Sequence, residues 1–168
     1  MIGVYNVINV MAESLFPVVD AYYKTFSKYG QDASISWDNE RFYQRLCMKG
    51  LAESLNCNVL ADRDLNGKNV DLQVLKDDIC QVAIEMKRFF SASGEPEIPR
   101  FLDDIRSLQN HLEIAEKIFV ITTIHDIKNQ DDNINFLSEK LNIPKDSFVR
   151  KSVALNENVI FEIIGIVI

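Results

Sequence analysis

A β-hairpin is predicted by the stretch VDLQVLKDDICQVAIEMK, which covers residues 70–87. Apolar residues at Val70, Leu72 and Val74 alternate with polar ones, which is the period of a strand with one buried face. A second alternating run extends from residue 79 to residue 90, and the polar residues between the two runs are typical of a turn. Two such strands joined by a short polar turn are expected to pair antiparallel.

Helices and further strands are predicted on both sides of this hairpin. The expected helices cover residues 1–29 with a break or kink at Pro17, 38–55 with Asp38 as N-cap, 99–113 with Pro99 in the first turn, and 131–141. Further strands are expected at residues 57–61, 117–124, 148–154 and 159–168. The sequence therefore predicts a single α/β domain over residues 1–168, with a mixed central β-sheet flanked by helices.

Composition and charge narrow the class of protein. The chain has 168 residues, of which 47% are hydrophobic, and this suits one packed domain. No apolar run approaches the roughly 20 residues that cross a bilayer. Three cysteines without metal-ligand spacing are expected to be reduced thiols, so a cytoplasmic protein without membrane contact is predicted. A net charge of −7 argues against a large nonspecific DNA-binding surface, although it is compatible with a local basic cleft.

Three charged residues of the hairpin are candidates for chemistry. Glu85 and Lys87 are two residues apart on one strand, so their side chains point to the same face. The antiparallel partner strand can bring Asp71 close to both. Paired carboxylates suit a divalent cation that activates water and polarises a phosphate, and a nearby lysine can orient that water. The pattern therefore predicts metal-assisted hydrolysis of phosphodiester bonds.

This arrangement resembles the PD-(D/E)xK nuclease superfamily, whose fold is restriction-endonuclease-like. The resemblance covers roughly residues 38–124, as a helix, a hairpin with Asp71 and then Glu85-Met86-Lys87, a second helix and a further strand. It implies a metal-dependent nuclease, with DNA as the expected nucleic acid. It also implies that Asp71, Glu85 and the carbonyl of Met86 bind Mg²⁺ or Mn²⁺, and that Lys87 is the catalytic lysine. Residues 1–30 and 131–168 would then be an N-terminal helical segment and a C-terminal helix with strands around this core.

Many members of the superfamily also carry a Glu on the core helix near the metal, and Glu40 is the matching residue here. At 100° per residue Glu40 shares a stripe with Tyr43, Cys47 and Leu51, which predicts that it faces inward as a metal ligand. A first-turn acid favoured by the helix dipole is an equally good interpretation of Glu40, and the two roles are compatible.

Two features depart from the family pattern. Val70 stands where Pro often precedes the Asp, and Gln109 is followed four residues later by Glu113, where one large branch has Tyr. The chain is therefore not assigned to that branch. A second acidic-x-Lys triplet, residues 126–128, follows a strand that lacks a hairpin partner carrying an Asp, so the architecture favours the hairpin triplet.

Other interpretations stay open. The three hairpin residues can instead form a solvent-facing ion-pair cluster, and the fold can serve as an inactive binding or assembly module in a homo-oligomer or larger complex. Four cations either line a phosphate cleft or are scattered over the surface: Lys68, Arg88, Arg100 and Arg106. His111 and His125 have no second ligand at zinc spacing, so no zinc site is predicted.

Overall fold

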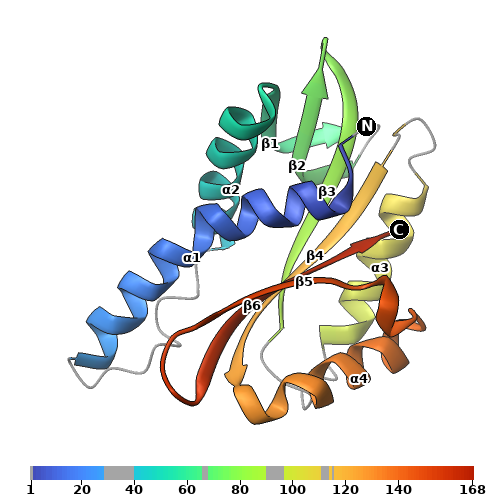
Figure 1. Ribbon diagram of the computed structural model, residues 1–168. Helices are drawn as coiled ribbons and strands as arrows, with labels where there is room; N and C mark the ends of the chain where they lie inside the picture. Colours follow the sequence, from blue (N-terminus) through green and yellow to red (C-terminus); the bar gives the residue numbers. More distant parts are fainter. Residues whose placement is uncertain (1, 29–39, 66–67, 90–96, 111–113, 115) are drawn as a thin grey trace.

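Six strands form one mixed sheet in the computed structural model of the protein (Figure 1). The structure describes residues 2–28, 40–65, 68–89, 97–110, 114 and 116–168. The strands are β1 (Asn58–Leu65), β2 (Lys68–Lys76), β3 (Ile79–Phe89), β4 (Glu116–Asp126), β5 (Val149–Ala154) and β6 (Val159–Val167). Their order is β1-β2-β3-β4-β6-β5, in which β3 and β4 run parallel and all other neighbours run antiparallel.

Helices cover both faces of this sheet. In the described part of the chain they are α1 (Val4–Lys28), α2 (Glu40–Leu55), α3 (Ile98–Gln109) and α4 (Gln130–Leu141). The side chains of β3 alternate between the two faces of the sheet and contribute to a hydrophobic core on each. Ile84 and Met86 pack with α1 and α2, whereas Ala83 and Phe89 pack with α3 and α4. The result is a single mixed α/β domain, as predicted. No helix among the described residues has the length and apolarity needed to cross a membrane.

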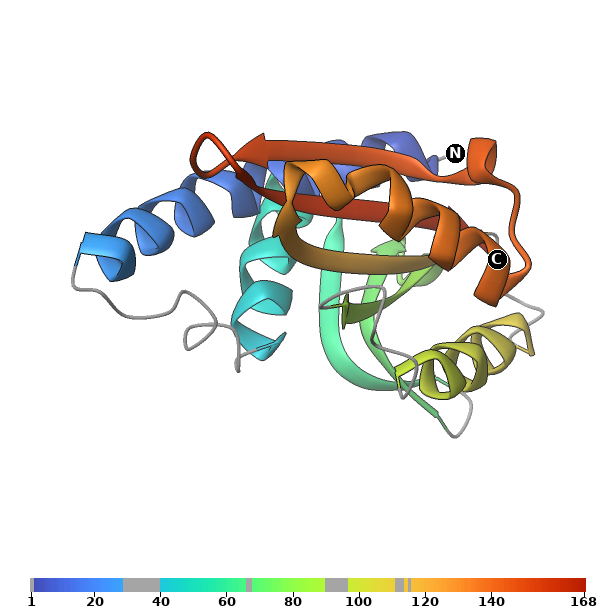
Figure 2. The same cartoon turned by 90° about the horizontal axis from the view of Figure 1, so that it is seen from below.

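The first helix packs against the C-terminal strands. Ile8, Met11 and Leu15 of α1 recur every three or four residues and are fully buried. Gly165 of β6 permits the close approach, since a Cβ atom there would lie only 2.4 Å from Cγ1 of Ile8. The C-terminal end of α1 projects beyond the sheet, as both ribbon views show (Figures 1 and 2).

Of the break or kink predicted at Pro17, the break does not occur, because α1 continues through that residue. Proline removes the hydrogen bond that the carbonyl four residues earlier would otherwise accept. That carbonyl belongs to Glu13, and both Glu13 and Pro17 are exposed. Water can therefore satisfy the carbonyl, and the helix tolerates the proline.

The predicted hairpin is confirmed. β2 and β3 pair antiparallel from Lys76↔Ile79 to Leu72↔Ile84. Asp77 and Asp78 form the two-residue turn with φ angles of 52° and 61°. Positive φ at both turn positions matches the right-handed twist of the flanking strands, and Asp tolerates it better than most residues.

Several element boundaries differ from the predictions. β1 is longer than residues 57–61, because it pairs with β2 as far as Leu65↔Lys68. α3 ends at Gln109, and residues 111–113 of the predicted helix lie outside the described part. The predicted N-cap Asp38 also lies outside it, and α2 begins at Glu40.

Candidate active site

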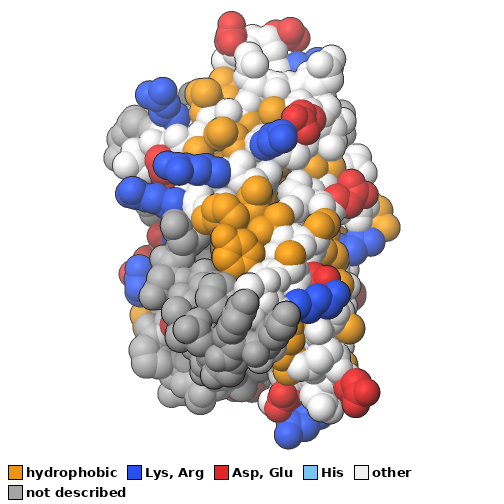
Figure 3. Space-filling model, turned by 90° about the vertical axis from the view of Figure 1, so that its left-hand side faces the viewer, with side chains coloured by type: hydrophobic (Ala, Val, Ile, Leu, Met, Phe, Trp, Pro, Cys, Tyr) orange, Lys and Arg blue, Asp and Glu red, His pale blue; other side chains and the backbone are white. Residues whose placement is uncertain are grey.

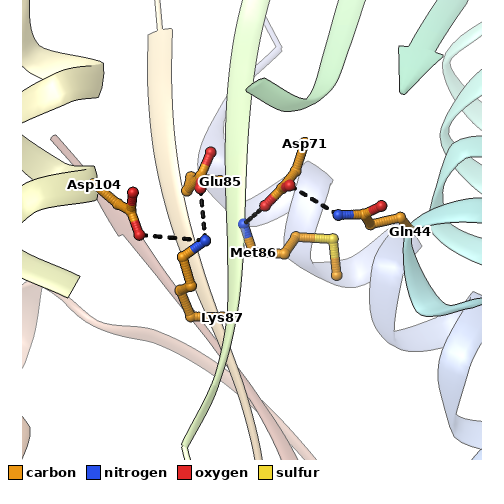
Figure 4. A network of polar contacts seen from close by, with 6 residues as sticks. All are labelled: Gln44, Asp71, Glu85, Met86, Lys87 and Asp104. Atoms are coloured by element: carbon orange, nitrogen blue, oxygen red, sulfur yellow. Dashed lines mark hydrogen bonds and ion pairs between the residues drawn. The ribbon is translucent and has the colours of Figure 1, made fainter. Parts of the chain in front are cut away.

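Glu85 and Lys87 project from β3 toward α3, as their alternation predicts (Figure 4). Nζ of Lys87 lies 2.6 Å from Oε1 of Glu85 and 3.3 Å from Oδ2 of Asp104 on α3. Glu85 is only 7% exposed, and Lys87 is partly buried. Solvent and salt screen such a pair less than a surface pair. The ammonium is therefore held firmly between two carboxylates.

Asp71 approaches β3 from the neighbouring strand. The regular pairing of β2 with β3 ends at Leu72↔Ile84, and beyond this point the backbone N–H of Met86 donates to Oδ2 of Asp71 at 2.7 Å. Nε2 of Gln44 on α2 donates to the other oxygen, Oδ1, at 2.8 Å. Figure 4 shows that Asp71 is turned toward α2, whereas Lys87 is turned toward α3. Two hydrogen bonds to a carboxylate fix its orientation strongly.

The backbone of Met86 adds an oxygen to this side of the strand. In an extended strand the N–H and C=O of one residue point to the same side. Because the Met86 N–H donates to Asp71, the Met86 carbonyl also points to the side of β3 on which Asp71 lies. The Met86 side chain packs in the core formed with α1 and α2. The backbone of Met86 therefore interacts with Asp71, while the Met86 side chain stabilises the fold.

Gln44, Asp71, Glu85, Lys87 and Asp104 are called the β3 cluster below. Burial, followed by the charge of Asp71, raises the pKa of Glu85, and the Lys87 ammonium only partly opposes this. Burial lowers the pKa of Lys87, but Glu85, Asp71 and Asp104 outweigh it, so this pKa is raised overall. The charge of Asp71 therefore raises the pKa of both Glu85 and Lys87, its two predicted partners. Asp71, Glu85, Asp104 and Lys87 together carry a net charge of −2 when all four groups are ionised.

The oxygen donors of the β3 cluster suit a hard divalent cation. Carboxylates and backbone carbonyls are ligands that Mg²⁺ and Mn²⁺ prefer, and Asp71, Glu85 and Met86 supply both kinds. In the described part of the chain, no three His, Cys, Asp or Glu side chains form a metal site. Because Mg²⁺ keeps several of its waters, two carboxylates and a carbonyl can hold it once their oxygens converge, whereas here Glu85 is turned toward α3 and Asp71 toward α2 (Figure 4). The side chain of Glu40, the third predicted acid, lies outside the described residues.

Sequence reasoning missed two members of the cluster, Gln44 and Asp104. Gln44 lies one turn after Glu40 and is only 3% exposed. Asp104 stands beside Phe101 and Ile105, two of the buried residues of α3. In both cases a polar residue occupies the apolar stripe of an amphipathic helix, and this is the signal that could have identified them.

The four cations considered for a phosphate cleft do not share one face. Arg88 follows Lys87 in β3 and therefore points to the α2 side, where its charge acts on Tyr43. Arg100 and Arg106 are exposed on α3, which covers the opposite face. The side chain of Lys68 lies outside the described residues. A common cleft of Arg88 with the arginines of α3 is therefore excluded.

A second polar cluster lies where α4 meets strands β4, β5 and β6. Glu162, only 1% exposed, accepts hydrogen bonds from Nε of Arg150 at 2.8 Å and from Nε2 of Gln130 at 3.1 Å. Nε2 of His125 lies 3.6 Å from its other oxygen, and Nδ1 of His125 lies 2.8 Å from Nδ2 of Asn133. These five residues are called the β6 cluster below. One carboxylate and one guanidinium leave it without net charge when His125 is neutral.

Comparison with known proteins does not assign the chain to a family. No protein-family model matches it, and no significantly similar curated protein or solved structure was found. The class of protein must therefore be inferred from the β3 cluster itself.

Proposed function

We propose that this protein is a Mg²⁺- or Mn²⁺-dependent nuclease of the PD-(D/E)xK type, with DNA as its substrate. The observation that carries the proposal is that Asp71 and Glu85, on two strands of one hairpin, are near enough for their charges to interact, while Lys87 pairs with Glu85. The order of α2, the β2–β3 hairpin, α3 and the parallel strand β4 supports a restriction-endonuclease-like core. Fold alone does not determine function, so the site carries more weight than this order.

The carboxylate residues of the β3 cluster have the task of holding the cation. Asp71, Glu85 and the carbonyl of Met86 are the proposed ligands, and the bound cation supplies an acidified water and polarises the phosphate. Gln44 orients Asp71 through its hydrogen bond to Oδ1. The raised pKa of Glu85 reflects carboxylate repulsion and burial, and a divalent cation relieves the repulsion.

Lys87 has the task of positioning the nucleophile. Its pKa is raised overall, so the ammonium stays protonated at neutral pH and donates a hydrogen bond to the attacking water. A preorganised positive charge also stabilises the negative charge that develops on the phosphate. Oδ2 of Asp104 lies 3.3 Å from Nζ of Lys87, so Asp104 would still hold this ammonium in the site if Glu85 bound a cation.

Two lysine variants test the proposal in a cleavage assay on plasmid and single-stranded DNA. The wild-type protein should cleave with Mg²⁺ or Mn²⁺ and not with EDTA. Lys87→Ala should lose about a hundredfold or more of the rate, because a preorganised charge is removed from the reaction. Lys128→Ala is the matched control, since Lys128 belongs to the other acidic-x-Lys triplet and forms an exposed pair with Asp126 at 3.5 Å. It should cleave at the wild-type rate.

The same assay with Asp71→Ala should also show loss of cleavage, with circular dichroism to confirm that the protein is folded. Cleavage that survives in Lys87→Ala or Asp71→Ala would contradict the proposed site. An equal loss in Lys128→Ala would show that the assay reports general destabilisation.

One observation favours a second candidate, a non-catalytic binding or assembly module. The charged groups of Asp71, Glu85 and Lys87 all have protein partners without any cation, as in a structural network. Size-exclusion chromatography and Mn²⁺ titration separate the two candidates. An oligomer that neither binds Mn²⁺ nor cleaves DNA would establish the module, whereas saturable Mn²⁺ binding supports the nuclease.

A further inference from the structure

The outer face of α2 carries a row of cations. Arg41, Arg45 and Lys49 are spaced four residues apart, so they lie on one side of the helix, and all three are exposed. With a rise of 1.5 Å per residue, neighbours in the row are about 6 Å apart along the helix axis, and the row spans about 12 Å. Arg41, Arg45 and Lys49 are called the α2 row below.

Among the residues that the structure describes, the charges of the α2 row are poorly compensated. Lys49 approaches Glu53 at 3.9 Å, but both side chains are about 70% exposed, and such a pair contributes little. Arg41 and Arg45 form no ion pair with any residue that the structure describes. Like charges four residues apart destabilise a helix. In a chain with net charge −7, such a row favours a partner with concentrated negative charge.

The α2 row adjoins the β3 cluster through the helix itself. Gln44, which donates to Asp71 at 2.8 Å, precedes Arg45 in the sequence and follows Arg41 by three residues. The buried side of α2 therefore contacts the proposed site, and its outer side presents the cations. Figure 3 shows Lys and Arg side chains gathered along one margin of the face that α1 and α2 form.

We propose that the α2 row binds the phosphate backbone of the nucleic acid on which the β3 cluster acts, an inference that rests on the proposed nuclease function. Guanidinium groups bind phosphates through two parallel hydrogen bonds, and a single row of cations suits a linear polyanion. A membrane surface is disfavoured, because Phe42 and Leu46, which neighbour the row, pack against the core. Phosphate contacts of this kind position a substrate without reading its sequence.

Binding is tested without cleavage, by fluorescence anisotropy of a labelled DNA duplex in EDTA over a range of KCl concentrations. The double variant Arg41→Gln/Arg45→Gln should bind about tenfold more weakly at low salt. The slope of log K against log salt should become shallower by about two, because two phosphate contacts are lost. Lys24→Gln/Lys128→Gln is the matched control, since it removes two exposed cations elsewhere, and it should keep the wild-type affinity and slope.

A second pair, Arg41→Lys/Arg45→Lys, keeps the charge and should recover most of the affinity and the whole salt slope. The inference is overturned if wild-type protein does not bind DNA, if the control pair weakens binding as much, or if an acidic peptide competes as well as DNA does. The outcome is independent of the cleavage assay. If the Arg→Gln pair binds DNA more weakly but the wild-type protein does not cleave it, the nuclease function is contradicted and phosphate binding by the α2 row is supported. If the Arg→Gln pair binds normally and the wild-type protein cleaves, phosphate binding by the α2 row is contradicted and the nuclease function is supported.

Discussion

The β3 and β6 clusters both place ionised groups at buried positions of the same sheet, but they differ in charge balance. In the β6 cluster Glu162 is matched by Arg150, which shares its Oε1 with Gln130, and Nε2 of His125 lies 3.6 Å from its Oε2. In the β3 cluster the carboxylates of Glu85 and Asp104 pair with one ammonium, and the pKa of Glu85 is raised by burial and by the nearby charge of Asp71.

This difference separates a structural role from a functional one. A buried ion pair that is balanced and hydrogen-bonded holds elements together, and removing one partner is costly. A group with excess charge of one sign is less stable than it would be with a counter-ion, and such perturbed groups concentrate at functional sites. The comparison therefore favours a structural role for the β6 cluster and supports the proposal that the β3 cluster binds a cation.

The largest effect on stability is expected at the β6 cluster. Glu162→Gln deprives the partly exposed Arg150 guanidinium of its buried carboxylate partner, and should lower the free energy of unfolding by about 3 kcal/mol. Urea denaturation measures the change. The exposed Glu157 in the β5–β6 turn provides the control, and Glu157→Gln should have almost no effect. If Glu162→Gln were as stable as this control, the β6 cluster would have no structural role.

A Glu→Gln substitution in the β3 cluster should raise the free energy of unfolding instead of lowering it when no divalent cation is present. The ionised form of Glu85 is less favourable in the folded protein than in the unfolded chain, because its pKa is raised. Glu85→Gln should therefore stabilise the protein at pH 7 by on the order of 1 kcal/mol or less, since lost attraction to Lys87 offsets part of the gain.

This gain has a defined pH dependence. Wild-type Glu85 becomes neutral as the pH falls through its raised pKa, so the difference between variant and wild type should shrink toward acid pH. Urea denaturation in EDTA measures the difference in unfolding free energy between Glu85→Gln and wild type at pH 7 and at pH 5. A variant that is less stable than wild type at pH 7, by as much as Glu162→Gln, would show that the β3 cluster is also a structural network.

The smallest effect is expected from His125. Burial lowers its pKa, with Glu162 opposing and Arg150 assisting, so the fold holds this side chain neutral. The unfolded chain takes up the proton more readily, and stability should therefore fall as the pH drops below about 6.5. His125→Gln should flatten this part of the curve of unfolding free energy against pH, whereas His111→Gln serves as the comparison. An unchanged curve in His125→Gln would show that a residue other than His125 causes the loss of stability at acid pH.

The hairpin was predictable because side chains in a strand alternate with a period of two. This period indicates both which residues form the buried face and to which face each side chain points. Val70, Leu72 and Val74 marked the strand, and Glu85 and Lys87 lie on one face of β3 as expected. Asp104 was not predictable in the same way, because its contact with Lys87 depends on how α3 packs within the crossover that connects β3 to β4.

The β6 cluster was beyond the reach of local patterns. His125, Gln130, Arg150 and Glu162 come from four different elements, and they meet only because β6 inserts between β4 and β5 in the sheet. Strand order is decided by tertiary packing, and a single sequence carries little information on it. The break expected at Pro17 does not occur for a related reason. The cost of the hydrogen bond that proline removes depends on whether Glu13 and Pro17 are exposed in the packed helix.

Calorimetric titration of Mn²⁺ into the wild-type protein, Glu85→Gln and His125→Gln tests most directly whether excess charge in the β3 cluster marks a cation site. We predict saturable binding by the wild-type protein and by His125→Gln, and none by Glu85→Gln, because one of two ligand carboxylates is lost. A wild-type protein that binds no Mn²⁺, or a Glu85→Gln variant that binds it undiminished, would contradict this assignment.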